Sequence, residues 1–282
     1  MPVPNEAASG KSSTGGLPSR MGKVVVLIPT FNRPEMLRES IESVLAQTYS
    51  DFELHLGLDG VAEPVRRVAL SFRDRSNVFV HDFPENRGTF ATLEDLLSTT
   101  ESTYVSFFSD DDLMEPTFLG DCVAELARSP GRHPYAYSHI YYWHPDRLEF
   151  KPECGRVNLN AVVFVRAYLD ELIRRHGFCF EPAYRRYYAD AVLLRRLDRM
   201  GAHLHVCRPL VRWRIHPGQN TKSVEISLRQ ILEQSHALHM SGLPYGFREL
   251  LQRMQWLVGR KAGVSRSQIR RALSGDNRAP PS

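Results

Sequence analysis

Three consecutive aspartates, Asp110, Asp111 and Asp112, form the pattern in the chain that points most directly to chemistry. Ser109 separates them from Tyr104–Phe108, an apolar stretch typical of a buried strand. Adjacent carboxylates repel one another unless water or a cation neutralises them. The cluster is therefore either a solvated acidic loop, a group of acids at a helix N-terminus, or a metal site. Its position at a strand end favours a divalent ion, Mg²⁺ or Mn²⁺, that bridges a carboxylate to a diphosphate.

Three further residues could do chemistry, and each also has an ordinary structural explanation. Asp59 ends an alternating apolar strand and could accept hydrogen bonds from a base or ribose, or simply form a turn with Gly60. Asp190 begins a predicted helix and could be a general base, although its local sequence favours an acid that complements the helix dipole. His216 follows the strand-like stretch Leu210–Ile215 and precedes a Pro-Gly turn, so it is either structural or a ligand that completes a metal site.

The elements that must position these residues alternate between strand and helix in the first half of the chain. This alternation with short links predicts a doubly wound, mostly parallel α/β sheet of the Rossmann-like type. Ligands of such sheets bind beyond the carboxyl ends of the strands, where the polar residues 30–32, 59–60, 86–88 and 109–112 all fall. Strands are predicted at 24–28, 52–58, 78–81 and 104–108, and helices at 34–47, 63–73, 89–99 and 117–128.

The second half is less regular. Residues 135–164 are rich in aromatic side chains and are predicted to form strands and loops. Helices are predicted at 166–176, 188–200, 224–240, 245–258 and 266–274.

Composition excludes several classes of protein. The 282 residues carry a net charge of +4 without a dense basic block, so we expect no nucleic-acid partner. The four cysteines show no C-x-x-C spacing, so neither a zinc site nor a redox motif is expected. The chain has no apolar run near the roughly 18 residues of a membrane span and no apolar secretory signal. It also lacks a Walker A sequence, a Gly-x-Gly-x-x-Gly after the first strand, and a Gly-x-Ser-x-Gly elbow.

Five segments, taken in order, resemble family 2 glycosyltransferases of the GT-A fold. The resemblance covers roughly residues 23–220, and its specificity lies in the order and spacing of all five segments. They are Val26–Arg33, Ser43–Gly60, Glu85–Gly88 with Tyr104–Asp112, Ala189–Leu197, and Leu210–Gly218.

The resemblance implies roles for particular residues. Asp190 would be the general base of an inverting transfer from a nucleotide-diphosphate sugar, with a UDP- or dTDP-sugar favoured, to an acceptor hydroxyl or amine. Mn²⁺ or Mg²⁺ would be the cofactor, with Asp111 as the first choice of ligand and Asp112 and His216 beside it. The residues implied to hold the nucleotide sugar are Pro29, Thr30, Phe31, Asn32, Arg33, Asp59, Arg87 and Asp110.

Two positions depart from the family pattern. Ser109 stands where the first Asp of the metal motif is usual, which leaves the register of the acidic cluster open by one residue. Ala189 stands in the frequent Glu-Asp pair, so Asp190 is the carboxylate left for the base. The alternatives are a sugar nucleotidyltransferase, whose Gly-rich first loop is replaced here by Pro29–Asn32, and a non-catalytic nucleotide-sugar binder.

The sequence and the resemblance also predict how the chain is divided into domains. Residues 1–21 are expected to be a disordered leader and 22–220 the GT-A domain, divided into a nucleotide-sugar half (22–130) and an acceptor half (131–220). Residues 221–282 are expected to be a helical extension that covers the acceptor site, mediates a homodimer, or only packs.

The acceptor is left open between a carbohydrate, a lipid-linked molecule and a small molecule. The expected location is the cytoplasm, with peripheral membrane contact left open. The aromatic residues Tyr135, Tyr137, Tyr141, Tyr142 and Trp143 either line the acceptor site or belong to the core.

Overall fold

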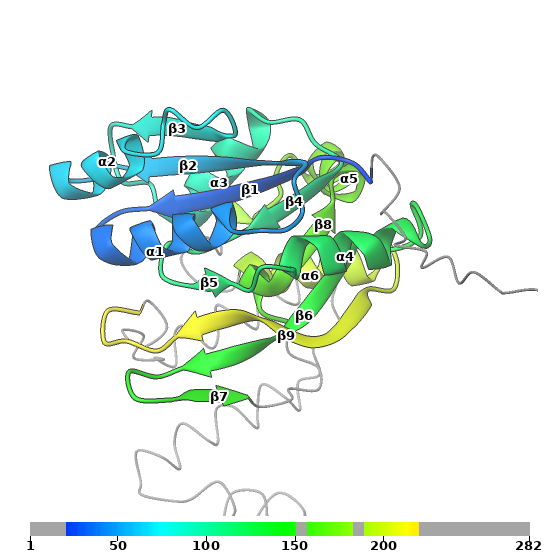
Figure 1. Cartoon of the computed structure of the whole chain (residues 1–282). Helices are drawn as coiled ribbons and strands as arrows, with labels where there is room; N and C mark the ends of the chain where they lie inside the picture. The colour runs from blue at the N-terminus through cyan, green and yellow to red at the C-terminus, as the bar shows by residue number, and fades with distance from the viewer. Residues whose placement is uncertain (1–20, 151–156, 183–188, 220–282) are drawn as a thin grey trace, which may run out of the picture.

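The first strand of the computed structural model, β1 (Val24–Thr30), is buried at every position and lies inside a mixed sheet. The structure describes residues 21–150, 157–182 and 189–219. β1 pairs in parallel with β2 (Phe52–Asp59) and β4 (Tyr104–Phe107), and β2 pairs in parallel with β3 (Val78–Phe83). The parallel arrangement predicted for the first half is confirmed, and Figure 1 shows these strands side by side.

The second half extends the sheet with strands of both directions. Across the described residues the strand order is β3-β2-β1-β4-β8-β6-β9-β5, and β7 pairs with β6. β8 is antiparallel to β4 and β6, whereas β9 is parallel to β6 and antiparallel to β5. β5 has two residues, too few for a sequence pattern to reveal. The added strands are β5 (Leu113–Met114), β6 (Tyr135–Trp143), β7 (Leu148–Phe150), β8 (Val162–Val165) and β9 (Leu204–Arg214).

Helices cover both faces of the sheet, as a doubly wound fold requires. Side chains of β1 alternate between the faces: Val24, Val26 and Ile28 enter one hydrophobic cluster, and Val25 and Leu27 enter the other. This explains why β1 is apolar at consecutive positions. The first cluster packs against α1 (Pro34–Leu45), α2 (Glu63–Leu70) and α4 (Phe118–Ala127), and the second against α3 (Thr89–Ser98), α5 (Arg166–His176) and α6 (Ala189–Asp198).

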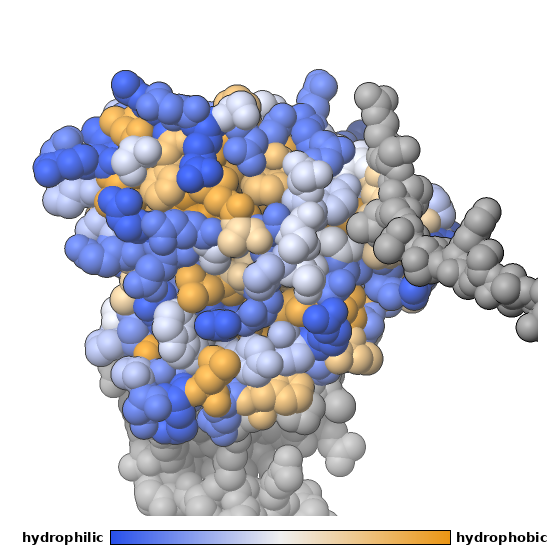
Figure 2. Space-filling view, in the orientation of Figure 1, coloured by the Kyte–Doolittle hydropathy of each residue, from blue (hydrophilic) through white to orange (hydrophobic). Residues whose placement is uncertain are grey.

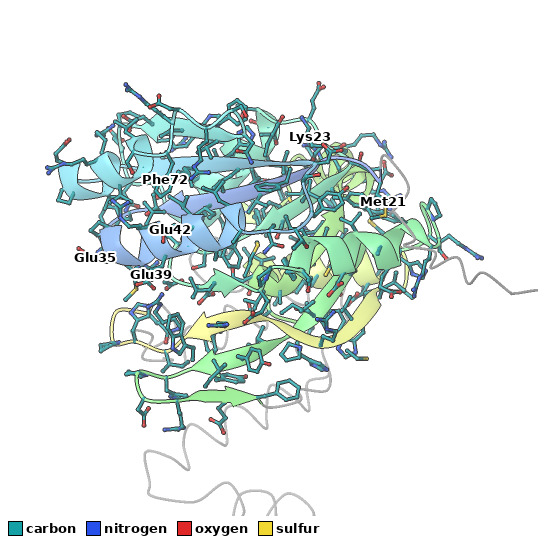
Figure 3. The ribbon with its side chains drawn as sticks, in the orientation of Figure 1. Met21, Lys23, Glu35, Glu39, Glu42 and Phe72 are labelled. Carbon is teal, nitrogen blue, oxygen red and sulfur yellow. The ribbon has the colours of Figure 1, made fainter. Side chains whose placement is uncertain are left out.

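Helix α1 illustrates how the sequence sets this packing. Its buried residues Leu37, Ile41 and Val44 recur at helical spacing. Figure 3 shows Glu35 and Glu39 on the same helix, and both are exposed. The surface in Figure 2 is correspondingly hydrophilic over much of this face, with separate apolar patches.

The observed helix bounds agree with the predicted ones to within a few residues. The predicted leader, apart from Met21, and the predicted helices at 224–240, 245–258 and 266–274 lie outside the described residues. Among the described residues, no helix combines the length and apolarity needed to cross a bilayer. The cysteines of the described residues, Cys122, Cys179 and Cys207, are free thiols.

Candidate active site

The acidic turn lies between β4 and β5, and helix α1 holds it from one side. Ser40 Oγ donates a hydrogen bond to the carbonyl of Ser109 (2.9 Å), and Ser43 Oγ accepts one from the backbone N–H of Met114 (3.1 Å). Further along the same helix, Gln47 Nε2 donates to the carbonyl of Glu115 (2.7 Å). Both ends of the turn are thus tied to a helix that packs against the sheet.

Asp110 is buried and heavily hydrogen-bonded. Thr30 Oγ1 donates to its Oδ2 (2.7 Å), and Nη2 of Arg33 lies 2.7 Å from its Oδ1. Burial raises the pKa of Asp110 to about 6, and the neighbouring Asp111 adds to the rise. The charge of Arg33 and the hydrogen bonds from Thr30 and the backbone of Phe31 act in the opposite direction. Asp110 therefore lies just beyond β4 and beside the end of β1, as the sheet topology predicts.

Asp111 is the aspartate of the turn with the most varied partners. Its carboxylate accepts hydrogen bonds from Ser109 Oγ and from Nη1 of Arg33. Nε2 of His216 lies 3.0 Å from its Oδ2, although 105 positions separate the two residues. The structure therefore brings together Arg33, Asp111 and His216, three residues for which the sequence predicted related roles.

Asp112 points elsewhere. It is fully buried, and its carboxylate accepts hydrogen bonds from the backbone N–H of Arg214 (2.9 Å) and from the side chain of Asn160. Burial raises the pKa of Asp112 well above its usual range, with a further contribution from Asp111. Asp110 and Asp111 line the cavity described below, and Asp112 is absent from the described lining residues. This placement gives Asp112 the position of a brace between β9 and the 3₁₀ turn η1 (Leu159–Ala161).

The end of β9 closes the site from the second half of the chain. Arg214 Nε donates to the carbonyl of Asp111 (2.8 Å), and its guanidinium lies 4.0 Å from the ring centroid of Trp143. The backbone N–H of the same residue is bonded to Asp112. Arg214 thereby fixes the direction of β9 just before His216.

Asp59 and Arg87 contact each other away from the acidic turn. Asp59 accepts hydrogen bonds from the backbone N–H groups of Arg87 (2.8 Å) and Gly88 (2.9 Å), and the side chain of Arg87 pairs with Asp95. Gly60 beside them has φ +65°, and a Cβ there would lie 2.5 Å from the backbone nitrogen of Asn86. Asp59 thus holds the 86–88 loop against the end of β2, and neither Asp59 nor Arg87 is among the described residues that line the cavity.

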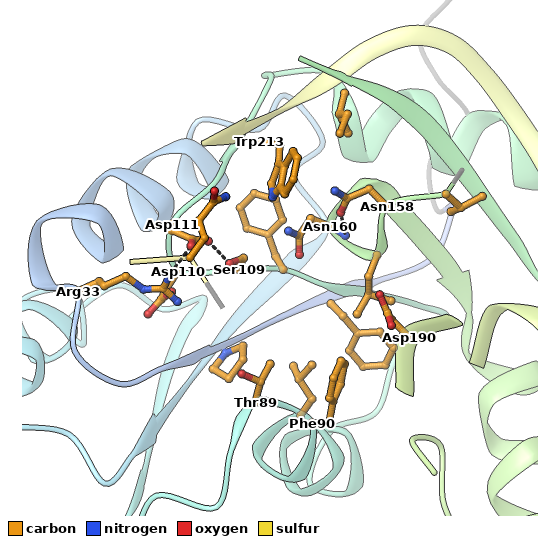
Figure 4. Close-up of a pocket in the computed structure, with 18 of the residues that line it drawn as sticks. Arg33, Thr89, Phe90, Ser109, Asp110, Asp111, Asn158, Asn160, Asp190 and Trp213 are labelled. Atoms are coloured by element: carbon orange, nitrogen blue, oxygen red, sulfur yellow. Dashed lines mark hydrogen bonds and ion pairs between the residues drawn. The ribbon is translucent and has the colours of Figure 1, made fainter. Parts of the chain in front are cut away.

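A cavity of about 400 Å³ opens at this edge of the sheet, and its walls come from both halves of the chain. Pro29, Arg33, Asp110 and Asp111 line one side, and Asp190 lines another. Figure 4 shows Asp111 with Arg33 and Ser109 across the cavity from Asp190. Four further predicted residues are not among the described lining residues: Phe31, which is 44% exposed, the exposed Asn32, and the buried Thr30 and His216.

Asp190 lies in the first turn of α6 and is partly buried. Its Oδ1 accepts a hydrogen bond from the backbone N–H of Ala191 (2.8 Å), as expected for an acid at a helix N-terminus. Burial nevertheless raises the pKa of Asp190, against the opposing effect of hydrogen bonds from the backbone N–H groups of Ala191 and of Asp190 itself. Both explanations of Asp190 considered for the sequence are thus compatible with its position.

Several lining residues were not singled out from the sequence. Asn158, Asn160, Trp213 and Gln219 face the cavity and carry the amide and aromatic groups that recognise polar ligands. Gln219 is also the partner of the backbone N–H of His216 (3.4 Å). An Asn-x-Asn pair in a loop is a weak signal, so proximity in the fold was needed to find them.

The aromatic stretch divides between the core and the cavity. Tyr135 is fully buried and donates a hydrogen bond to Asp198 (2.7 Å). Tyr142 lines the cavity and packs edge-to-face on Trp213 with ring centroids 5.4 Å apart. Tyr135 therefore belongs to the core, whereas Tyr142 lines the cavity.

The residues at the acidic turn fit a divalent ion that is shared with a diphosphate. In the described part of the chain no three His, Cys, Asp or Glu side chains are grouped so that they could hold a metal by themselves. Mg²⁺ commonly binds through one or two carboxylates together with substrate phosphates, so a complete protein cage is not required. Asp111 and His216, whose side chains lie 3.0 Å apart, are the residues that could bind such an ion.

Solved structures show the same fold. The chain aligns with residues 1–349 of TarS from S. aureus, solved with UDP-GlcNAc, with a TM-score of 0.65 and 14% identity, covering 91% of this chain and 76% of that one. It aligns with the mannosyltransferase PcManGT of Pyrobaculum calidifontis, solved with GDP-Man and Mn²⁺, with a TM-score of 0.63 and 15% identity, covering 93% and 78%. The fold is therefore the GT-A fold of glycosyltransferases.

The sequence comparisons identify the family. The family model of glycosyl transferase family 2 matches residues 25–167, just over half of the chain, and the chain belongs to this family. An uncharacterized glycosyltransferase of Rickettsia typhi is 34% identical over 134 residues, covering 44% of this chain and 41% of that protein. The glucosyl-dolichyl phosphate glucuronosyltransferase of Haloferax volcanii is 32% identical over 133 residues, covering 46% and 42%. The chain thus spans less than half of the length of these two relatives.

Proposed function

We propose that the chain is an inverting glycosyltransferase that moves a sugar from a nucleotide-diphosphate sugar to an acceptor hydroxyl or amine. The observation that carries this proposal is the cavity between Asp111 and Asp190, with an acidic turn on one wall and a partly buried carboxylate on the other. Structural neighbours bound to UDP-GlcNAc and GDP-Man support a nucleotide sugar as donor. A UDP- or dTDP-sugar remains our favoured donor.

The donor side would hold the nucleotide diphosphate. Asp111 and His216 would bind Mn²⁺ or Mg²⁺ together with the diphosphate, while Asp110, bonded to Thr30 and Arg33, keeps the end of β1 in place. When bound, the metal would stabilise the negative charge that grows on the departing nucleotide diphosphate. Asp112 was predicted as a further metal ligand, but its bonds to Arg214 and Asn160 favour a positioning role.

The acceptor side would supply the base. Asp190 takes the proton from the acceptor group, which then attacks the anomeric carbon from the face opposite the diphosphate. A carboxylate whose pKa is raised is a stronger base than one fully exposed to water, which suits proton transfer near neutral pH. The base is held by the N-terminus of α6, so its position is fixed by the packing of that helix on the sheet.

The acceptor we favour is a carbohydrate. Trp213 and Tyr142 present aromatic surface in the cavity, and Asn158 and Gln219 present amides. Apolar ring faces and flanking hydrogen-bonding groups match the two surfaces of a sugar ring. Lipid-linked and small-molecule acceptors would be bound by the same surface only through a sugar portion.

Replacing the base tests the proposal. We expect Asp190→Asn to lower the rate of transfer by roughly 10² to 10⁴-fold, the usual contribution of a general base. Nucleotide affinity should change little, because Asp190 lies across the cavity from Asp111. Asp198→Asn is the matched control: it removes a carboxylate from the same helix, one bonded to Tyr135 outside the cavity lining. Equal turnover by Asp190→Asn and wild type would remove Asp190 from the base role.

A further inference from the structure

Arg33 is the one basic residue among the described residues that line the cavity. Its Nη2 lies 2.7 Å from Asp110 Oδ1, and its Nη1 is bonded to Asp111 Oδ2. Its Nε is buried and has no hydrogen-bond partner within the described residues. The guanidinium therefore spans two neighbouring carboxylates through its terminal nitrogens and retains one unused donor.

This bridge explains how the two carboxylates can lie side by side below the protein surface. Asp110 is 2% exposed and Asp111 is 7% exposed, so water screens their mutual repulsion poorly. A planar guanidinium can bond two oxygens at once, which a lysine ammonium does less well. Arg33 is thus the internal counter-ion of the acidic turn.

The counter-ion shares its carboxylate with the proposed metal position. Asp111 Oδ2 is bonded to Arg33 Nη1, and His216 Nε2 lies 3.0 Å from the same atom. A divalent ion held by Asp111 and His216 would place a second positive charge beside the guanidinium, in a site that water screens poorly. The repulsion between the two cations would weaken the bond between Arg33 and Asp111.

We infer that Arg33 competes with the divalent ion for Asp111 and moves to the nucleotide diphosphate when the ion binds. This inference rests on the proposed metal- and nucleotide-dependent function, and it adds how metal binding and nucleotide binding affect each other. Once released, the guanidinium lies beside the cavity with its Nε already unpaired, and the diphosphate is the new anion within the site. Metal and nucleotide consequently bind with positive coupling. Each has a low affinity when it binds alone, because Arg33 keeps its bond to Asp111 until both the metal and the diphosphate are bound.

Calorimetric titration of Mn²⁺ measures the competition directly, without any transfer reaction. In the absence of nucleotide, Arg33→Gln should bind Mn²⁺ on the order of tenfold more tightly than wild type. Adding UDP, dTDP or GDP should tighten Mn²⁺ binding in wild type, and this gain should shrink by a similar factor in Arg33→Gln. Arg33→Lys keeps the charge but bridges the two carboxylates less well, so its affinity for Mn²⁺ alone should lie between those of wild type and Arg33→Gln. It keeps the test valid if the neutral variant folds poorly.

Two controls locate the effect. Arg66→Gln removes the same charge from an ion pair with Asp82 on α2 and β3, and it should leave Mn²⁺ affinity unchanged. Asp111→Asn combined with Arg33→Gln should abolish the gain in affinity. Unchanged or weaker Mn²⁺ binding by Arg33→Gln, or a gain that survives loss of Asp111, would overturn the inference. A failure of the proposed function has a different signature: nucleotide binding and sugar transfer would be absent. The titration with Mn²⁺ alone would still test the role of Arg33 in that case.

Discussion

The proposed donor side of the cavity and its proposed acceptor side handle charge in opposite ways. On the donor side, Asp110 and Asp111 are bonded to groups of other elements, and Asp59, outside the cavity lining, holds the neighbouring 86–88 loop. On the acceptor side, Asp190 is bonded to the N–H of the adjacent residue in its own helix, and its pKa is raised by burial. In the proposed mechanism the first side holds a charged ligand in one place, and the second supplies the carboxylate that accepts a proton.

The largest effect expected within the acidic turn separates two neighbouring aspartates. Asp111→Asn should lower kcat/KM by roughly 10² to 10³-fold, because it weakens the charge that holds the metal and the diphosphate. Asp112→Ala should instead lower the free energy of unfolding by about 1–3 kcal/mol, because it leaves the buried N–H of Arg214 without its acceptor. Steady-state kinetics and thermal denaturation of both variants check this. Loss of metal-dependent binding in a well-folded Asp112→Ala would make Asp112 a ligand and change the register of the motif.

Asp59→Ala tests whether the donor wall depends on the 86–88 loop. The change leaves the backbone N–H groups of Arg87 and Gly88 without their acceptor. We expect a loss of about 1–3 kcal/mol in the free energy of unfolding, measured by chemical denaturation. Asp95→Ala, which removes the exposed partner of the Arg87 side chain, is the control and should cost under about 1 kcal/mol. Unchanged stability in Asp59→Ala, combined with lost nucleotide binding, would favour direct contact with the nucleotide.

Trp213→Ala tests the acceptor wall. A lost stacking surface of this kind is expected to raise KM for a carbohydrate acceptor by about tenfold, equivalent to about 1.4 kcal/mol. The donor dissociation constant should stay the same if Trp213 serves the acceptor alone. Phe150→Ala removes an exposed aromatic ring of β7 that is not among the described lining residues, and should leave both constants unchanged. A rise in the donor constant would move Trp213 to the donor side.

The pH dependence of turnover gives the smallest expected effect. Asp190 must be deprotonated to accept a proton, so turnover falls as the pH drops through its pKa. Because burial raises that pKa, the acid limb of kcat should lie above the value near 3.9 of an exposed aspartate. The measurement is kcat against pH at saturating donor and acceptor. An acid limb at the ordinary position, with folded protein, would argue against a buried base.

The sequence predicted the strands and helices of the first half better than the sheet of the second half, for a physical reason. β1 is buried on both faces, so its run of apolar residues is visible without any knowledge of its neighbours. Asp110 and Asp111 follow a strand whose carboxyl end must meet that of β1, and topology alone placed them. Local patterns were sufficient wherever strands are parallel and connected by helices.

The rest of the site depends on contacts between distant residues. The bond from the backbone of Arg214 to Asp112 spans 102 positions, and His216 lies next to Asp111 across 105. Nothing in the local sequence shows that Asp112 accepts a backbone N–H, so it was grouped with the metal ligands. Asn160 was missed for the same reason, because its importance arises from its contact with Asp112.

Calorimetric titration of UDP, dTDP and GDP, each with and without Mn²⁺, tests the central claim most directly when wild type is compared with Asp111→Ala. The account predicts that one nucleotide binds wild type, that Mn²⁺ tightens its binding, and that the metal dependence disappears in Asp111→Ala. Failure of all three nucleotides to bind folded protein, or metal-dependent binding that survives in Asp111→Ala, would contradict the assignment of this cavity to a nucleotide sugar.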